Sequence, residues 1–235
     1  MLQFLKTQVY YPVLDLLFPK YCIACETLIS AEAGFLCLSC KHTLPYTDME
    51  KMEENVAQIR MLTKLPVQFA ASLLYFIDAG MVRAMLHKLK YHNRPEIGVY
   101  LGELLGQKFS AQAWFRSVDA IVPVPLHAAK KAKRGYNQSE CIAEGIANYS
   151  HKPILANVIK RTRNTSSQTD KSRKERMDNV ADAFALRRAK QIEGKHILLV
   201  DDVLTTGATL ASCGSSILKE ANCTLSIATV AIAYH

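Results

Sequence analysis

Two adjacent acids followed by a run of hydroxyl residues form the most chemically suggestive stretch of the sequence. Asp201 and Asp202 follow the apolar run 197–200, and Thr-Thr-Gly-Ala-Thr occupies 205–209. Successive N–H groups at a helix N-terminus bind phosphate, and a glycine lets the backbone approach it closely. Carboxylates accept hydrogen bonds from vicinal hydroxyls. The stretch therefore predicts a sugar-phosphate site where a buried strand ends and a helix begins near Ala208.

Residues 197–209 resemble the phosphoribosyl pyrophosphate (PRPP) motif of type I phosphoribosyltransferases. The resemblance assigns the ribose hydroxyls to Asp201 and Asp202, our candidate catalytic residues. It assigns the 5′-phosphate to Thr205, Thr206, Gly207, Ala208 and Thr209. The alternative, a strand that ends in a chance Asp-Asp turn, does not explain three threonines around one glycine.

A second candidate anion site follows another predicted strand. Residues 119–125 are typical of a buried strand that stops at Pro125, since proline cannot continue a central ladder. A loop with four cations within 130–134 follows, and a helix is expected from near Ser139. Because PRPP carries phosphate at both ends, the resemblance implies a separate pyrophosphate loop. We assign that role to Arg134, Gly135, Tyr136, Asn137 and Gln138.

Two further cations are candidates for the same ligand. Lys90 lies at the end of a helix predicted from the apolar face of 81–89, where it either faces an anion or stabilises the helix dipole. Arg161 begins a polar segment, 161–179, that resembles the mobile arm of glutamine PRPP amidotransferases and related enzymes. The alternative for this segment is a solvated basic loop. The other positions that look like the family's spacing are Gln168, Arg176, Asn179 and Phe184.

Four of the seven cysteines form two C-x2-C pairs, Cys22 with Cys25 and Cys37 with Cys40. This spacing predicts a closed, tetrahedral four-thiolate zinc site with a structural role. Disulfides are the alternative, which the expected reducing compartment disfavours, and the repeated pair disfavours a thioredoxin-like redox motif. Buried thiols, with a reactive cysteine as the alternative, are expected at Cys141, Cys213 and Cys223.

Composition narrows the class of protein. The 235 residues are 49% hydrophobic, which suits one medium domain and a small module. A net charge of +8 favours anionic ligands, either phosphorylated metabolites or nucleic acid. We expect no membrane span and a cytoplasmic location, because the sequence has no run of eighteen apolar residues and no signal-peptide pattern. Without a P-loop or a Rossmann glycine motif, neither a nucleotide-hydrolysing motor nor a dinucleotide enzyme is supported.

The candidate residues need strands and helices to position them. Strands are expected at 67–76, 119–125, 154–159, 197–200 and 225–232, with helices at 81–89, 96–109 and 208–221. The resemblance implies an α/β fold, a type I phosphoribosyltransferase-like parallel sheet flanked by helices, over residues 66–235. Residues 1–65 are expected to hold an amphipathic N-terminal helix, the small zinc-binding module and a polar linker at 43–65.

The wider sequence resembles the ComF family of competence proteins, including its GntX-like relatives. The residues that carry this resemblance are Val-Pro-Val-Pro-Leu-His at 122–127, Arg-Gly-Tyr-Asn-Gln at 134–138, the four cysteines and the stretch 200–209. It implies action in natural transformation, the uptake and processing of single-stranded DNA, beside other competence proteins such as helicases or recombination mediators. It also implies PRPP with Mg²⁺, and transfer of phosphoribosyl to an unknown acceptor with release of pyrophosphate.

Two other functions stay open at this point. The chain could be a non-catalytic module that binds single-stranded DNA, with PRPP as a ligand only and Tyr91 and Tyr136 as stacking candidates. It could also be an adaptor that uses its N-terminal helix. The zinc module stands where amidotransferases have a glutaminase domain, so use of glutamine is not expected.

Overall fold

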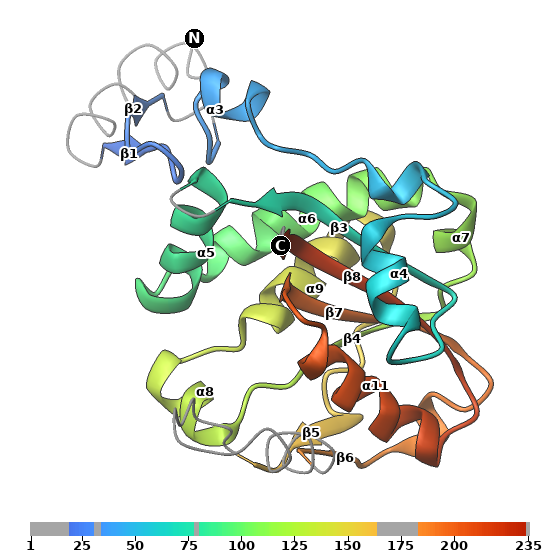
Figure 1. Ribbon diagram of the computed structural model, residues 1–235. Coiled ribbons are helices and arrows are strands. Elements are labelled where there is room, and N and C mark those ends of the chain that lie inside the picture. Colours follow the sequence, from blue (N-terminus) through green and yellow to red (C-terminus); the bar gives the residue numbers. More distant parts are fainter. Residues whose placement is uncertain (1–18, 31–33, 78–79, 164–182, 234–235) are drawn as a thin grey trace, which may run out of the picture.

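The computed structural model describes residues 19–30, 34–77, 80–163 and 183–233 (Figure 1). Its centre is a four-stranded sheet in the order β3-β8-β7-β4, in which every neighbouring pair is parallel. The strands are β3 (Phe69–Phe76), β4 (Ala120–Pro123), β7 (His196–Leu204) and β8 (Thr224–Ala233). The predicted parallel sheet is confirmed. The predicted N-terminal helix, and Gln168, Arg176 and Asn179 of the predicted arm, lie outside the described residues.

Helices cover both faces of this sheet, which confirms the predicted α/β class. They include α4 (Val56–Leu62), α5 (Met81–Tyr91), α6 (Pro95–Ser110), α7 (Ala113–Arg116), α9 (Gln138–Ser150) and α11 (Ala208–Glu220). Figure 1 shows α4 and α11 in front of the sheet and α6 and α9 behind it. Strands covered on both faces are apolar along their length, and β7 and β8 are accordingly almost completely buried.

The N-terminal module is a small unit at one end of the sheet domain (Figure 1). It contains the antiparallel pair β1 (Lys20–Tyr21) and β2 (Leu28–Ile29), followed by α3 (Leu38–His42). Its buried residues Ile23 and Leu36 belong to the main hydrophobic core, and the Phe35 ring lies 4.9 Å from that of Tyr100 on α6. The module therefore packs directly on the domain.

The segment between the module and β3 also packs on the domain. It forms the single turn η3 (Met49–Lys51) and helix α4, and it buries Met49 and Met61 completely. Asn55 caps α4 by accepting a hydrogen bond from the N–H of Gln58 at 2.9 Å. The division of the chain at residue 65 stays a prediction.

Two local expectations differ from the structure. The strand expected at 154–159 is wrong, because Ile154 makes only an isolated bridge to Ile121 before the chain turns. The next strand, β5 (Ile159–Arg161), pairs antiparallel with β6 (Phe184–Leu186) outside the main sheet, and the turn η4 (Ala189–Gln191) follows. The basic loop after β4 contains a helix, α8 (Ala128–Arg134), because its alanines, lysines and arginine favour helix.

Helices α6 and α9 pack at unusually close range because glycines face each other at their crossing. A Cβ on Gly102 would lie 2.1 Å from the Ile142 carbonyl oxygen, and one on Gly145 would lie 1.9 Å from the Val99 carbonyl oxygen. Neither clash involves a flexible side chain. Since α9 begins beside the strand ends, this contact helps to hold its N-terminus there.

We expect Gly145→Ala to lower the free energy of unfolding by about 1–3 kcal/mol or more, because the added methyl group forces two backbones apart. Urea denaturation is the measurement. The control is Glu144→Ala, an exposed position on the same helix, which should change stability by no more than about 0.5 kcal/mol. Equal stability of the two variants would contradict the close packing.

Candidate functional site

The carboxyl ends of β4 and β7 open into a cavity of about 310 Å³. This is the edge where ligands bind in parallel α/β sheets. The cavity brings together nine of the predicted ligand-binding residues: Lys90, Arg134, Asn137, Gln138, Arg161, Asp201, Asp202, Thr205 and Thr209. They come from four segments of the chain, at residues 90, 134–138, 161 and 201–209.

Five other candidates lie next to the cavity in the chain but do not line it: Gly135, Tyr136, Thr206, Gly207 and Ala208. Gly135 ends α8 with a φ of +87°, and Gly207 precedes α11 with a φ of +80°, a region that favours glycine. The Tyr136 hydroxyl donates to the Leu89 carbonyl oxygen, so its ring has a packing role. These residues set the course of the backbone beside the cavity.

The acid pair is held by one neighbouring backbone donor and by two side chains from distant parts of the chain. The Ser139 hydroxyl donates to Asp201 Oδ1 at 2.9 Å, and the Asp202 N–H donates to the same oxygen at 2.9 Å. Lys90 Nζ lies 2.9 Å from Asp202 Oδ2. Burial, together with the neighbouring charge of Asp202, raises the pKa of Asp201 to about 7. The two carboxyl groups therefore differ in their partners.

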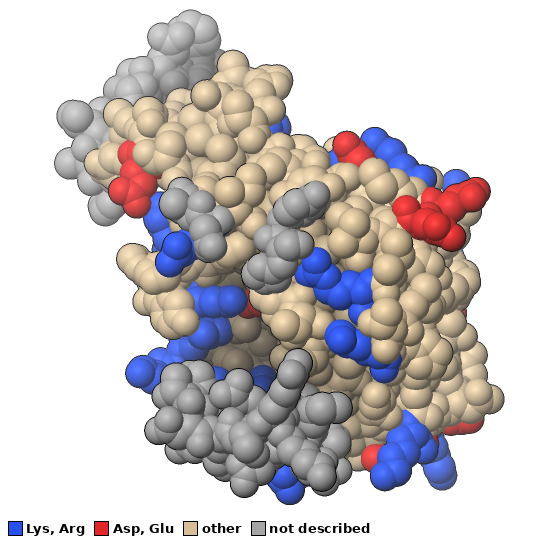
Figure 2. Space-filling model, in the orientation of Figure 1, with Lys and Arg blue, Asp and Glu red and all other residues tan. Residues whose placement is uncertain are grey.

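Three further cations line the same cavity. Lys130 and Arg134 come from α8 and Arg161 from β5. Burial, and the nearby guanidinium groups of Arg161 and Arg134, lower the pKa of Lys130. Figure 2 shows Lys and Arg along the edge of a hollow in this face of the molecule. Cations held this close to one another favour an anionic ligand.

Ser139 and Lys130 also belong to the cavity, although the sequence does not mark them as site residues. Ser139 appeared only as a helix start, and Lys130 only as one of four cations. A usable signal was the position of Ser139 in the first turn of the helix that follows a strand end. Asn137 precedes it, 1% exposed, and donates from Nδ2 to the Val124 carbonyl oxygen at 3.0 Å, so this predicted ligand residue also fixes the loop.

The four cysteines of the N-terminal module converge on one point. All four sulfur atoms, of Cys22, Cys25, Cys37 and Cys40, lie within 4.8 Å of one another, and Cys25 Sγ is 3.7 Å from Cys37 Sγ. Sulfurs about 2.3 Å from a tetrahedral zinc ion are about 3.8 Å apart, whereas a disulfide needs about 2.05 Å. The cluster therefore fits the predicted four-thiolate zinc site, and all seven cysteines are free.

The three remaining cysteines follow the prediction in part. Cys141 and Cys213 are buried, as expected, and burial raises the pKa of both thiols. Cys223 is only half-buried, because it follows α11 at the edge of the molecule.

None of the helices that the structure describes has the length and apolar character of a membrane span.

Comparison with known proteins identifies the class of this domain. Residues 90–235 match the family described as phosphoribosyl transferase domain, and the chain therefore belongs to that family. The chain is also similar to relatives named competence protein F and competence protein ComFC. This agrees with the resemblance carried by its motifs.

Three relatives show the extent of the similarity. Competence protein F of Haemophilus influenzae is 39% identical over 93 residues, which cover 39% of this chain and 41% of that protein. DNA utilization protein YhgH of Escherichia coli O157:H7 is 31% identical over 146 residues, 61% of this chain and 63% of that protein. Competence protein ComFC of Bacillus subtilis is 26% identical over 201 residues, 86% of this chain and 79% of that protein. The chain thus spans less than two thirds of the first two relatives.

The raised pKa of Asp201 predicts a pH-dependent stability. An unfolded Asp has a pKa of about 3.9, so between about pH 4 and pH 7 the folded protein binds more protons than the unfolded chain. Ionisation of Asp201 therefore lowers the free energy of unfolding as the pH rises through that window, and the full loss is reached above about pH 7. Asp201→Asn removes this pH-dependent loss. The stability of this variant relative to wild type should therefore increase from pH 5 to pH 8, measured by urea denaturation.

Asp48→Asn is the matched control for this measurement. Hydrogen bonds from Lys108 and Lys51 lower the pKa of Asp48, so this carboxyl group stays ionised from pH 5 to pH 8. The difference between this variant and wild type should stay constant from pH 5 to pH 8. If the Asp201→Asn difference is equally constant, Asp201 does not titrate in this range.

Proposed function

We propose that this protein binds PRPP with Mg²⁺ in the cavity at the strand ends and transfers phosphoribosyl to an acceptor, releasing pyrophosphate. The observation that carries the proposal is the convergence of an acid pair and four cations in one cavity. A ligand with vicinal hydroxyls between two phosphate groups suits this distribution of charge. The match of residues 90–235 to a phosphoribosyl transferase domain supports the same ligand.

Each part of the cavity has a role in this proposal. Asp201 and Asp202 accept hydrogen bonds from the ribose hydroxyls. The loop 205–209, with the N-terminus of α11 behind it, holds the 5′-phosphate. The pyrophosphate lies on the cationic side, toward α8 and Arg161. For Asp201, binding of a donor hydroxyl favours the ionised carboxylate that its burial disfavours.

The chemistry is displacement at the anomeric carbon of ribose. The bond from this carbon to the pyrophosphate oxygen breaks, the bonding electrons leave with pyrophosphate, and the acceptor forms the new bond. Positive charge develops on the sugar ring, so catalysis depends on positioning and on neutralising the leaving group. Mg²⁺, which prefers oxygen ligands, supplies part of that neutralising charge when bound. Lys130, Arg134 and Arg161 supply the rest.

We further propose that the protein acts in the use of DNA during competence, as the names of its relatives indicate for those proteins.

A second candidate function, binding of single-stranded DNA, is supported by a separate observation. Tyr91 is 68% exposed at the cavity, and the guanidinium carbon of Arg134 lies 5.7 Å from the centre of its ring. An exposed aromatic ring beside cations is a common arrangement for stacking a base. Helicases or recombination mediators are the expected protein partners.

Calorimetric titration of PRPP with Mg²⁺ tests the main proposal. Wild type should bind saturably, and the Asp201→Asn/Asp202→Asn double variant should lose at least about tenfold in affinity, because both acceptors of the ribose hydroxyls lose their charge. Asp48→Asn is the control and should bind as wild type does. If wild type does not bind PRPP but binds a single-stranded oligonucleotide with an affinity that falls steeply with salt, the second candidate replaces the first.

We propose that the cysteine cluster binds one structural zinc ion. The purified protein should contain one zinc per chain, measured by elemental analysis, and the Cys25→Ser/Cys37→Ser variant should lose it and melt at a lower temperature. Cys223→Ser removes a half-buried thiol outside the cluster and should keep the metal. If wild-type protein without metal melts at the same temperature as zinc-containing wild type, the structural zinc site is contradicted.

A further inference from the structure

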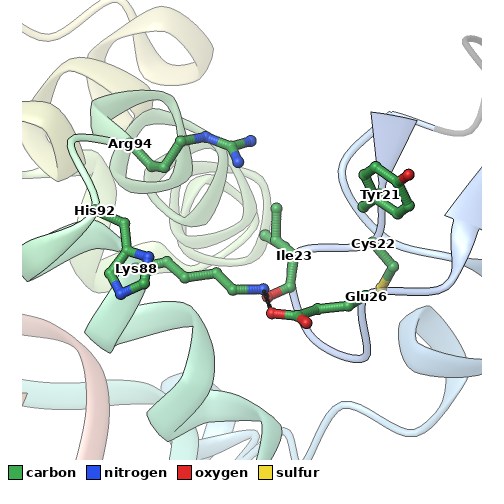
Figure 3. Close-up of a pocket in the computed structure, with 7 residues that line it drawn as sticks. All are labelled: Tyr21, Cys22, Ile23, Glu26, Lys88, His92 and Arg94. Atoms are coloured by element: carbon green, nitrogen blue, oxygen red, sulfur yellow. Dashed lines mark hydrogen bonds and ion pairs between the residues drawn. The ribbon is translucent and has the colours of Figure 1, made fainter. Parts of the chain in front are cut away.

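A single lysine connects the cysteine module to the helix that reaches the PRPP cavity. Lys88 Nζ donates to the Ile23 carbonyl oxygen at 3.0 Å and lies 2.9 Å from Glu26 Oε1 (Figure 3). These two residues directly follow Cys22 and Cys25, the first two ligands of the cluster. Lys88 therefore binds the turn that places two sulfurs on the metal.

This contact crosses an open space between the two parts of the molecule. A cavity of about 450 Å³ lies between the module and the ends of α5 and α6, lined by Tyr21, Cys22, Ile23, Glu26, Lys88, His92 and Arg94. Figure 3 shows the Lys88 side chain extended from α5 toward the turn. Only 16% of this side chain is exposed, although it comes from the end of a surface helix. A lysine that only stabilised the helix dipole would need no hydrogen-bond or ion-pair partner at this position. The partners of Lys88 therefore indicate a further role.

The next two residues of α5 contact the PRPP cavity and its loop. The Leu89 carbonyl oxygen accepts a hydrogen bond from the Tyr136 hydroxyl, and Lys90 Nζ lies 2.9 Å from Asp202 Oδ2. Side chains two apart on a helix point to nearly opposite sides. The last turn of α5 is thus bound to the module on one side, through Lys88, and to the acid pair on the other, through Lys90.

We propose that Lys88 is a positioning residue: through it the metal-bound cysteine turn holds the end of α5 where Lys90 meets Asp202, and PRPP affinity depends on the metal. The inference rests on the proposed function. Zinc fixes the turn that contains Ile23 and Glu26, and that turn fixes Lys88. Because Lys88 and Lys90 lie in the same helical turn, a fixed Lys88 also fixes Lys90. Coupling of this kind is reciprocal, so PRPP also strengthens retention of the metal.

The test is calorimetric titration of PRPP with Mg²⁺ into zinc-loaded wild type and Lys88→Met. Lys88→Met should bind PRPP about three- to tenfold more weakly while keeping one zinc per chain, because it loses the contact and not the metal site. Lys88→Arg keeps a long cationic donor at this position and should bind PRPP with wild-type affinity. Lys108→Met is the matched control, since Lys108 is a comparably buried lysine that pairs with Asp48 and Glu50, away from the cavity.

Removal of zinc distinguishes positioning from general destabilisation. Chelation should weaken PRPP binding by wild type as much as Lys88→Met does, and should have little further effect on that variant, since both break the same connection. Glu26→Gln, which removes only the exposed partner, should act in the same direction and covers the case in which Lys88→Met misfolds. Unchanged PRPP affinity in Lys88→Met, or fully additive effects of chelation and variant, would overturn the proposal.

Amide hydrogen exchange provides a readout that does not depend on PRPP. Chelation should speed exchange at residues 88–92 of wild type, and the same treatment of Lys88→Met should not speed it further. If wild type binds no PRPP, the proposed function fails, yet the exchange measurement still decides whether the module holds the end of α5. Exchange at 88–92 that is unaffected by chelation would refute the connection.

Discussion

Burial of two adjacent carboxyl groups in the carboxyl-terminal half of the central strand β7 is the constraint on which the arrangement of the site depends. Taking a carboxylate out of water is costly unless donors and cations replace the water. Asp201 receives hydrogen bonds from Ser139 and from the N–H of Asp202, and Asp202 has Lys90. The start of α9 and the end of α5 must both lie close to β7 to supply Ser139 and Lys90, so the arrangement of the site depends on the packing of these helices.

The close packing of the helices follows from the same requirement. Ser139 reaches Asp201 only because α9 lies tightly against the sheet and α6, and glycines at the crossing permit that approach. Asn137 holds the preceding loop to the end of β4 and accepts a hydrogen bond from the N–H of Ser139 at 3.2 Å. A small loss of packing between two helices, far from the cavity, would therefore move a donor of the acid pair.

The parts of the site that are contiguous in sequence were predictable, and Lys90 and Arg161 were also candidates, but the individual contacts between distant segments were not predictable. The strand, the acids and the loop 205–209 form one local pattern, and two C-x2-C pairs carry their own spacing rule. Ser139 lies 62 residues from Asp201, and nothing local marks that contact. The strand expected at 154–159 failed because a short apolar run does not reveal whether a partner strand is available. Helix α8 was missed because its charges were interpreted as a loop signal.

The distribution of charge across the cavity explains why one ligand class suits it better than a simple anion. A phosphate ion placed between the acid pair and the cations would be repelled on one side. A ligand with hydroxyl groups in its middle can donate to the acids while anionic groups at its ends meet the N-terminus of α11 and the side chains of α8. Such a ligand also removes the unfavourable crowding of Lys130, Arg134 and Arg161, and it compensates the burial of Asp201. A molecule that carries phosphate at two ends of one sugar would thus offset the unfavourable electrostatics of the acid pair and of the cations together.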